Sequence, residues 1–209
     1  MPTTISEWDE KHRQHGDGNQ QPSTILGELL PLLPAGAALD LACGTGRNAL
    51  LLAARQPVTA VDSSTVALET AERHAQRAGV AVSRGSRIEA ARSGLHLVRA
   101  DLENSEIASG DFSLIVCIKY LQRGLFPAIV EALAPGGVLL FETYTKAQLE
   151  FAAGPRNPEY LLDPGELRSA FPELQIVFYR ELRAESGIAS LLAKKSASGH
   201  ASKLTDHML

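Results

Sequence analysis

The spacing of hydrophobic residues along the chain predicts short buried strands and amphipathic helices in alternation. Isoleucine and leucine at helical spacing predict a helix within residues 22–33, and the polar segment before it favours another over residues 6–15. Apolar runs that end at glycine, proline or polar residues predict strands over residues 37–42, 58–62, 96–100, 112–118, 138–142, 174–182 and 187–194. Further helices are predicted over residues 48–55, 65–78, 125–134 and 164–171.

This order of elements predicts the topology of the sheet. Strands that alternate with helices are parallel and joined by right-handed crossovers. A short link separates the last two strands, so we expect these to be antiparallel and to add an antiparallel strand at the sheet edge. Residues 80–82 are apolar enough to begin a strand, whereas residues 83–94 are expected to form a polar insertion. The fold class is therefore α/β, with ligands bound beyond the carboxyl ends of the strands.

Length and composition restrict the class of protein. A chain of 209 residues suits one domain with short decorations, and it can bury a core without disulfides or metal. The formal net charge of -4, without a block of basic residues, argues against nucleic acid as a partner. The sequence has no apolar run of the ~18–20 residues that span a membrane, and residues 1–7 lack the features of a secretory signal. Two cysteines exclude a disulfide framework, so we expect a cytoplasmic protein.

A glycine-containing turn follows the first predicted strand. Gly44 and Gly46 remove two Cβ atoms where a ligand approaches the backbone, and the next helix presents free N–H groups that favour an anion. Asp62 stands at the carboxyl end of the second predicted strand, where a carboxylate accepts hydrogen bonds from both ribose hydroxyls of an adenosine. Residues 44–49 also fit the dinucleotide pattern G-x-G-x-x-A. The turn thus predicts that the protein binds a nucleoside. Which nucleoside cofactor it binds must be decided from other residues.

Two carboxylates distinguish between the nucleoside cofactors. Asp40 lies inside the first predicted strand, where dinucleotide binders keep apolar residues; a carboxylate there suits a ligand with an ammonium and a sulfonium. Asp101 follows the third predicted strand, where it can accept from an adenine amine with Leu102 beside the ring. The chain also has no second domain of useful size to hold a hydride acceptor. These features favour S-adenosylmethionine over NAD.

The same segments resemble a known superfamily. Residues 39–46 look like motif I of the class I S-adenosylmethionine-dependent methyltransferases, and residues 58–62 resemble their second motif. Residues 133–137 are similar to the turn before their fifth strand, and the resemblance covers residues 36–143. Within the superfamily, residues 8–10, 46–48 and 120–123 resemble small bacterial methyltransferases of the tellurite-resistance type.

The resemblance implies a Rossmann-like three-layer sandwich with a seven-stranded, mostly parallel sheet and one antiparallel strand near the C-terminus. We expect a helical cap over residues 1–35, the S-adenosylmethionine-binding domain over residues 36–195 and a polar tail over residues 196–209. It also implies which residues bind the cofactor: Asp40, Ala42, Cys43, Gly44, Gly46, Arg47, Asn48, Asp62, Ser63, Asp101, Leu102 and Cys117. For Arg47, the alternative is a solvated arginine in the first turn of a helix.

The residues that face the methyl acceptor are less clearly marked. Methyl transfer is an in-line displacement in which alignment supplies much of the rate, and we find no obvious acid–base pair. Each expected substrate contact is equally compatible with an ordinary surface or packing role: Trp8, Lys119, Tyr120, Arg123, Glu142, Tyr144 and Arg156. The loop over residues 151–163 follows the fifth strand, so we expect a substrate-side lid with Arg156 as its charged contact.

Two other groups of residues have side chains that could take part in a site. His12 and His15, with Asp9, have metal-ligand chemistry, but no third firm ligand follows them, so a solvated helix face is favoured and no metal is expected. Cys43 and Cys117 follow neighbouring strands of such a sheet, so both thiols are expected to border the cofactor pocket.

The sequence therefore predicts an S-adenosylmethionine-dependent methyltransferase that acts on a small-molecule acceptor and interacts with neither nucleic acid nor membrane. Two alternatives stay open: a non-catalytic S-adenosylmethionine-binding regulatory module and an NAD-linked oxidoreductase. The nucleophilic atom of the acceptor, the use of a general base and the oligomeric state are also open.

Overall fold

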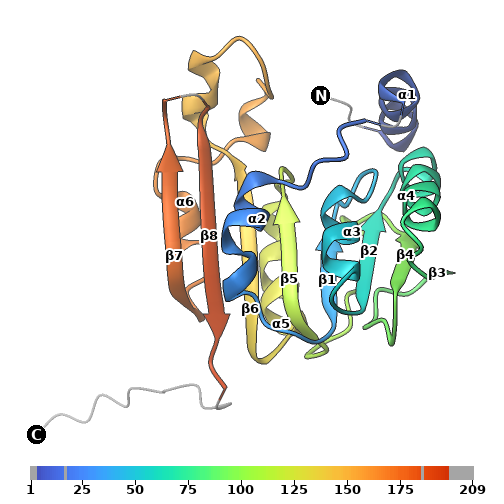
Figure 1. The fold of residues 1–209 in the computed structure, drawn as a ribbon. Helices are drawn as coiled ribbons and strands as arrows, with labels where there is room; N and C mark the ends of the chain where they lie inside the picture. Colours follow the sequence, from blue (N-terminus) through green and yellow to red (C-terminus); the bar gives the residue numbers. More distant parts are fainter. Residues whose placement is uncertain (1–3, 17, 185, 198–209) are drawn as a thin grey trace, which may run out of the picture.

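The structure, a computed structural model, describes residues 4–16, 18–184 and 186–197. Its centre is an eight-stranded sheet in the order β3-β4-β2-β1-β5-β6-β8-β7 (Figure 1). The strands are β1 (Ala38–Leu41), β2 (Val58–Asp62), β3 (Val82–Gly85), β4 (Leu95–Arg99), β5 (Phe112–Ile118), β6 (Leu133–Tyr144), β7 (Leu174–Leu182) and β8 (Ile188–Lys195). Most of the predicted polar tail, residues 198–209, lies outside the described residues.

Helices on both faces of the sheet complete a three-layer sandwich (Figure 1). One face is covered by α2 (Thr24–Leu29), α3 (Arg47–Ala53) and α4 (Thr65–Arg77), and the other by α5 (Phe126–Ala132) and α6 (Glu166–Ser169). Short 3-10 helices are η1 (Leu30–Leu32), η2 (Arg123–Leu125), η3 (Lys146–Glu150) and η4 (Pro158–Tyr160). The predicted Rossmann-like fold is confirmed. No helix within the described residues has the length and apolar character of a membrane span.

The sheet has one strand more than the seven expected, because residues 82–85 pair in parallel with β4 at the edge of the sheet. Two contacts with His96 of β4 account for this strand. Ser83 Oγ lies 2.8 Å from His96 Nδ1. Gly85 packs so closely on the imidazole that a Cβ atom would overlap it. The prediction of a polar insertion that begins at residue 83 was therefore wrong for its first three residues.

The rest of this segment is largely exposed and is attached to the sheet by Ile88 and by two hydrogen bonds. Ile88 is buried and forms an isolated bridge with Ile107. Thr59 of β2 donates its hydroxyl to the carbonyl of Glu89 at 2.6 Å and accepts the N–H of Ala91 at 3.1 Å. These bonds satisfy the buried threonine hydroxyl and hold residues 86–94 over β2, on the same face as α5.

The C-terminal hairpin differs from the expectation in one respect. β7 and β8 are antiparallel, as predicted, but β8 also pairs with β6, so the antiparallel strand lies between β6 and β7 and is not the sheet edge. β8 is buried along most of its length, whereas β7 is largely exposed. The more apolar strand thus takes the inner position.

Helix α1 (Ile5–His15) is attached above the carboxyl ends of the strands (Figure 1). Thr4 caps it in a capping box with Glu7. Asp9 on this helix accepts the hydroxyl of Ser64 at 2.6 Å and the N–H of Val66 at 3.3 Å. Because Ser64 also caps α4 by accepting the N–H of Ala67 at 3.1 Å, one buried hydroxyl joins the two helices.

Replacing Ser64 by alanine is expected to lower the free energy of unfolding by about 1–2 kcal/mol, because α4 loses its cap and Asp9 loses a donor. Urea unfolding measures this loss. The matched control is Ser93→Ala at an exposed loop serine, where the change should stay within about 0.5 kcal/mol. Equal unfolding midpoints for the two variants would contradict the role of this hydroxyl.

Candidate functional site

A cavity of about 780 Å³ opens at the carboxyl ends of the central strands, beneath α1. Its volume lies in the range of ~300–1,000 Å³ that is typical of small-molecule sites. Most of the predicted cofactor-binding residues line it: Ala42, Cys43, Gly44, Arg47, Asn48, Asp62, Ser63, Asp101 and Leu102. Asp40, Gly46 and Cys117 lie behind this lining. A second cavity of about 350 Å³, between residues 86–89 and 105–108, contains none of the predicted residues.

The turn after β1 has an unusual backbone. Ala42 has a φ of 54°, a left-handed conformation that costs a residue with a Cβ atom roughly 1–2 kcal/mol. Gly44 and Gly46 follow with φ of 54° and 81°. A Cβ atom on Gly46 would lie 2.8 Å from the Cβ of Ala71, so glycine is required for α3 to approach α4. The strained turn lets the backbone itself form one wall of the cavity.

Asp62 connects this turn to the end of β2. Its carboxylate accepts the N–H of Gly44 at 2.8 Å through Oδ2 and the N–H of Ser64 at 2.9 Å through Oδ1. Burial raises the pKa of Asp62, and these backbone donors oppose that effect. These two bonds hold the Asp62 carboxylate at the cavity wall, between the turn after β1 and the end of β2.

Asp40 is a buried carboxylate inside β1. It is 1% exposed, and within the described chain its Oδ2 has no hydrogen-bond partner. Burial raises its pKa to about 7, although the N–H of Ala49 favours the ionised form. A ligand ammonium group, bound directly or through water, would supply the hydrogen-bond donor that this buried oxygen lacks.

Asp101 and Leu102 follow β4 at the other end of the cavity. The Asp101 carboxylate accepts the N–H of Glu103 at 3.0 Å and the side-chain amide of Asn104 at 2.9 Å. Leu102 is 7% exposed and lines the cavity with an apolar surface. This combination of an oriented carboxylate and an apolar contact is suited to an adenine ring.

The two cysteines do not share the cavity, contrary to the prediction. Cys43 lines it, but Cys117 is 1% exposed and packs in the core beneath α5. The reason is register: Cys117 pairs with Leu41, so both side chains point to the same face of the sheet. The left-handed Ala42 then redirects the chain, and Cys43 packs on the other face.

Lys119, Tyr120 and Tyr144 line the opposite side of the cavity, after β5 and at the end of β6. Lys119 has a φ of 63°, held by an N–H bond to the carbonyl of Glu142 at 2.7 Å. Its Nζ lies 6.0 Å from the ring centre of Tyr144. Burial lowers the pKa of Lys119 and raises the pKa values of both tyrosines, so all three groups favour the neutral form more than they would in water.

Three predicted substrate residues lie outside the cavity lining. Glu142 is buried and accepts the hydroxyl of Ser190 at 2.7 Å. Arg156 donates to the carbonyls of Phe151 and Leu149, and so stabilises its own loop. Arg123 is the third of these residues.

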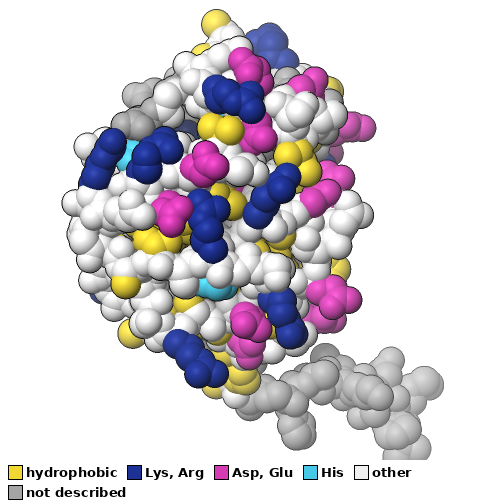
Figure 2. Space-filling view, turned by 90° about the vertical axis from the view of Figure 1, so that its right-hand side faces the viewer, with side chains coloured by type: hydrophobic (Ala, Val, Ile, Leu, Met, Phe, Trp, Pro, Cys, Tyr) yellow, Lys and Arg dark blue, Asp and Glu magenta, His cyan; other side chains and the backbone are white. Residues whose placement is uncertain are grey.

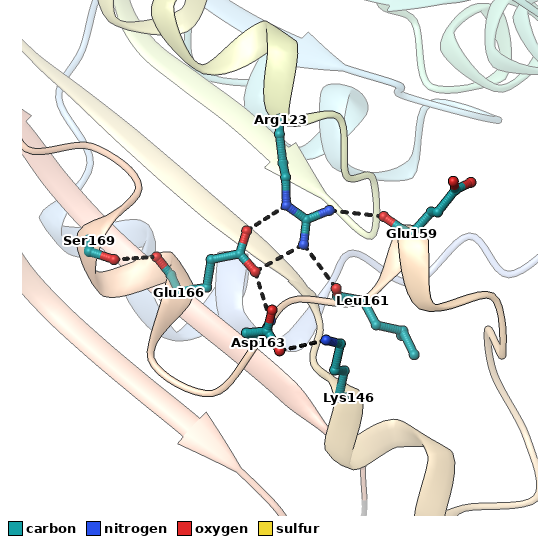
Figure 3. Close-up of polar contacts among 7 residues, drawn as sticks. All are labelled: Arg123, Lys146, Glu159, Leu161, Asp163, Glu166 and Ser169. Carbon is teal, nitrogen blue, oxygen red and sulfur yellow. Dashed lines mark hydrogen bonds and ion pairs between the residues drawn. The ribbon is translucent and has the colours of Figure 1, made fainter.

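Arg123 connects η2 to the segment that follows β6 (Figure 3). Its guanidinium forms an ion pair with Glu166 at 2.6 Å and donates to the carbonyls of Glu159 and Leu161, each at 3.0 Å. Lys146 and Asp163 form a second ion pair at 2.6 Å across the same segment. Of the predicted lid, Gly154, Pro155 and Tyr160 reach the cavity.

Sequence reasoning missed part of the contribution of α1. Trp8, an expected contact, lines the cavity together with Lys11 and His12. Lys11 Nζ lies 4.5 Å from the indole centre, and the indole stacks on His12 with ring centres 6.2 Å apart. Spacing of three and four residues from Trp8 is the signal that places these side chains on one helix face. Among described residues, no group of three metal-ligating side chains is close enough to hold an ion; the His15 side chain lies outside the described part.

Comparison with known proteins identifies sequences and folds similar to this chain. Residues 38–137 match the family described as "Methyltransferase domain". An uncharacterized protein of Synechococcus is 32% identical over 125 residues, which cover 56% of this chain. The match spans 27% of the length of that curated relative.

Solved structures share the fold at low sequence identity. An S-adenosylmethionine-dependent methyltransferase from Mesorhizobium loti superposes with a TM-score of 0.64 at 18% identity, over 85% of this chain and 100% of the other. TehB from Haemophilus influenzae superposes with a TM-score of 0.66 at 16% identity, over 90% of this chain and 67% of the other. Residues 38–137 thus resemble a methyltransferase domain, and the chain shares its fold with S-adenosylmethionine-dependent methyltransferases.

The raised pKa of Asp40 predicts how stability depends on pH without ligand. The unfolded carboxyl ionises near 3.8 and the folded one near 7. Between these values the unfolded state binds fewer protons, so stability falls as pH rises, by up to about 1.4 kcal/mol per pH unit, and the loss is complete above about pH 7. Asp40→Asn lacks this titration. Urea unfolding of both proteins at pH 5 and 7.5 should show the wild type losing stability relative to the variant; a constant difference would contradict the assignment.

Proposed function

We propose that this protein binds S-adenosylmethionine in the large cavity and transfers its methyl group to a small-molecule acceptor. The observation that carries the proposal is that Asp62 and Asp101, after two neighbouring strands, line one cavity, while the buried Asp40 lies inside the adjacent strand β1. The methyltransferase domain match covers all three carboxylates.

Each part of the donor has a counterpart in the chain. Asp62 is placed to accept the ribose hydroxyls, and Asp101 the adenine amine with Leu102 against the ring. Asp40 neutralises the ammonium, which supplies the missing partner of its buried oxygen. Arg47 and Asn48, at the start of α3, are placed to hold the carboxylate of the methionine portion.

The chain's contribution to the reaction is alignment and exclusion of water. Bound S-adenosylmethionine supplies an electrophilic methyl group on a sulfonium. The left-handed Ala42 and Lys119 end the two central strands, so the fixed backbone after β1 and β5 determines where the methyl group lies. Helix α1, with Trp8 on its inner face, covers the cavity and limits access by water. Positioning of this kind supplies much of the rate of an in-line displacement.

The expected partners and location belong to the same proposal. Figure 2 shows Lys and Arg interspersed with Asp and Glu over the face that it presents, without a continuous basic stripe among the residues drawn in colour. Such a surface lacks the electrostatic footprint of a nucleic-acid-binding protein. Two free cysteines are compatible with a reducing cytoplasm. The acceptor is therefore proposed to be a small molecule.

Donor binding tests the proposal in two ways. S-adenosylhomocysteine at 100 times its dissociation constant should add about 2.7 kcal/mol to the free energy of unfolding, visible as a thermal shift, whereas NAD should add nothing. Formation of S-adenosylhomocysteine from S-adenosylmethionine in the presence of acceptors then reports transfer. A thermal shift with NAD alone would support the oxidoreductase. Donor binding without transfer to any acceptor would support the regulatory module.

Asp62→Ala should weaken binding of S-adenosylhomocysteine about 10- to 150-fold, because a charged hydrogen-bonded contact is worth about 1.5–3 kcal/mol. Calorimetry measures the affinity. The matched control is Asp111→Ala, which removes an exposed carboxylate at the opposite end of the sheet, directly before β5. Wild-type affinity in the Asp62 variant would remove this residue from the donor site.

A further inference from the structure

The charges that line the cavity are divided between its two sides. The carboxylates of Asp62, Asp101 and Glu103 lie at the ends of β2 and β4, which is the side assigned to adenosine. The cationic groups of Arg47 and Lys119 lie at the start of α3 and after β5. With the donor placed as proposed, Lys119 is the positive group on the side left for the acceptor, and Lys11 of α1 is a further cationic residue of the lining.

Lys119 is directed to the cavity by its backbone. The left-handed φ of 63°, fixed by the N–H bond to Glu142, places its side chain among the lining residues, with Nζ 6.0 Å from the Tyr144 ring. Such a conformation in a residue with a Cβ atom costs free energy and recurs at ligand sites. The backbone of the turn after β5 therefore directs this side chain to the cavity.

The Glu142 carboxylate favours the charged form of Lys119 but forms no ion pair with it. Within the described ranges, Lys119 Nζ forms no ion pair, and it lies over the ring of Tyr144. The Glu142 carboxylate is bonded to Ser190 at 2.7 Å and does not line the cavity. Arg47 is a second positive charge close enough to disfavour the ammonium of Lys119. Lys119 and Arg47 line one cavity, and within the described residues neither forms an ion pair, an arrangement that suits a negative group on a ligand.

We propose that the methyl acceptor is a small molecule with a carboxylate, and that Lys119 binds this carboxylate beside Tyr144. The inference rests on the proposed function, in which Arg47 holds the carboxylate of the donor and leaves Lys119 for the acceptor. A negative group on the acceptor restores the charge balance of this side of the cavity and orients the molecule against the methyl group.

The transfer itself is balanced without a further reactant. A lone pair of the acceptor's nucleophilic atom forms the new bond to the methyl carbon, and the bond from that carbon to the sulfonium breaks. The bonding pair stays on sulfur and gives the neutral thioether of S-adenosylhomocysteine. A proton carried by the acceptor atom leaves to solvent. The carboxylate bound by Lys119 takes no part in these changes.

Binding of acids and matched amides to the protein saturated with S-adenosylhomocysteine tests the inference. The probes are benzoate with benzamide and 3-mercaptopropionate with 3-mercaptopropionamide, measured by calorimetry. Each acid should bind about 10-fold or more tightly than its amide. Lys119→Met should abolish this preference and leave amide binding and the affinity for S-adenosylhomocysteine unchanged, and Lys119→Arg should retain it. Lys194→Met, at an exposed lysine of β8, is the matched control for loss of one charge.

Each failure has a separate meaning. If the wild type does not bind S-adenosylhomocysteine, the proposed function fails. If it binds that ligand but no acid binds better than its amide, or no probe binds, the anionic acceptor is excluded. If Lys119→Met weakens S-adenosylhomocysteine binding as much as acid binding, Lys119 belongs to the donor site and the inference is overturned.

Discussion

The site depends on the bond of 2.8 Å between the Asp62 carboxylate and the N–H of Gly44. This bond joins the strained turn after β1 to the end of β2, and a second bond to Ser64 extends the connection to the cap of α4. Because Ser64 also binds Asp9, the position of α1 over the cavity depends on the same cluster. This group of hydrogen bonds therefore fixes both the turn after β1 and the position of α1, which line the cavity on two sides.

The sequence predicts several strands well because their apolar runs are local features. The strands Val58–Asp62, Phe112–Ile118 and Leu174–Leu182 have the bounds that their apolar runs predict. Gly44 and Asp62 were assigned to the site because a turn without Cβ atoms and an acid at a strand end each have a physical meaning in an α/β sheet. Their contact in the structure brings these two local signals together.

Other features depend on long-range contacts that no local pattern encodes. The edge strand of residues 82–85 includes a close contact between Gly85 and His96 of the next strand. Cys117 does not line the cavity because its side chain points to the same face of the sheet as that of Leu41. Arg123 has the same sequence environment whether it meets a substrate or Glu166, and only the tertiary structure distinguishes the two (Figure 3). Long-range partners of this kind, such as Glu166 for Arg123, cannot be read from the local sequence.

The central claim is that a methyl donor occupies the cavity at the ends of β1, β2 and β4. Amide chemical shifts of the 15N-labelled chain during titration with S-adenosylhomocysteine test this claim residue by residue. The account predicts that the largest changes fall in residues 42–48, 62–64 and 100–103, with smaller changes on α1. Changes confined to the second cavity, at residues 86–89 and 105–108, or no saturable change at all, would contradict it.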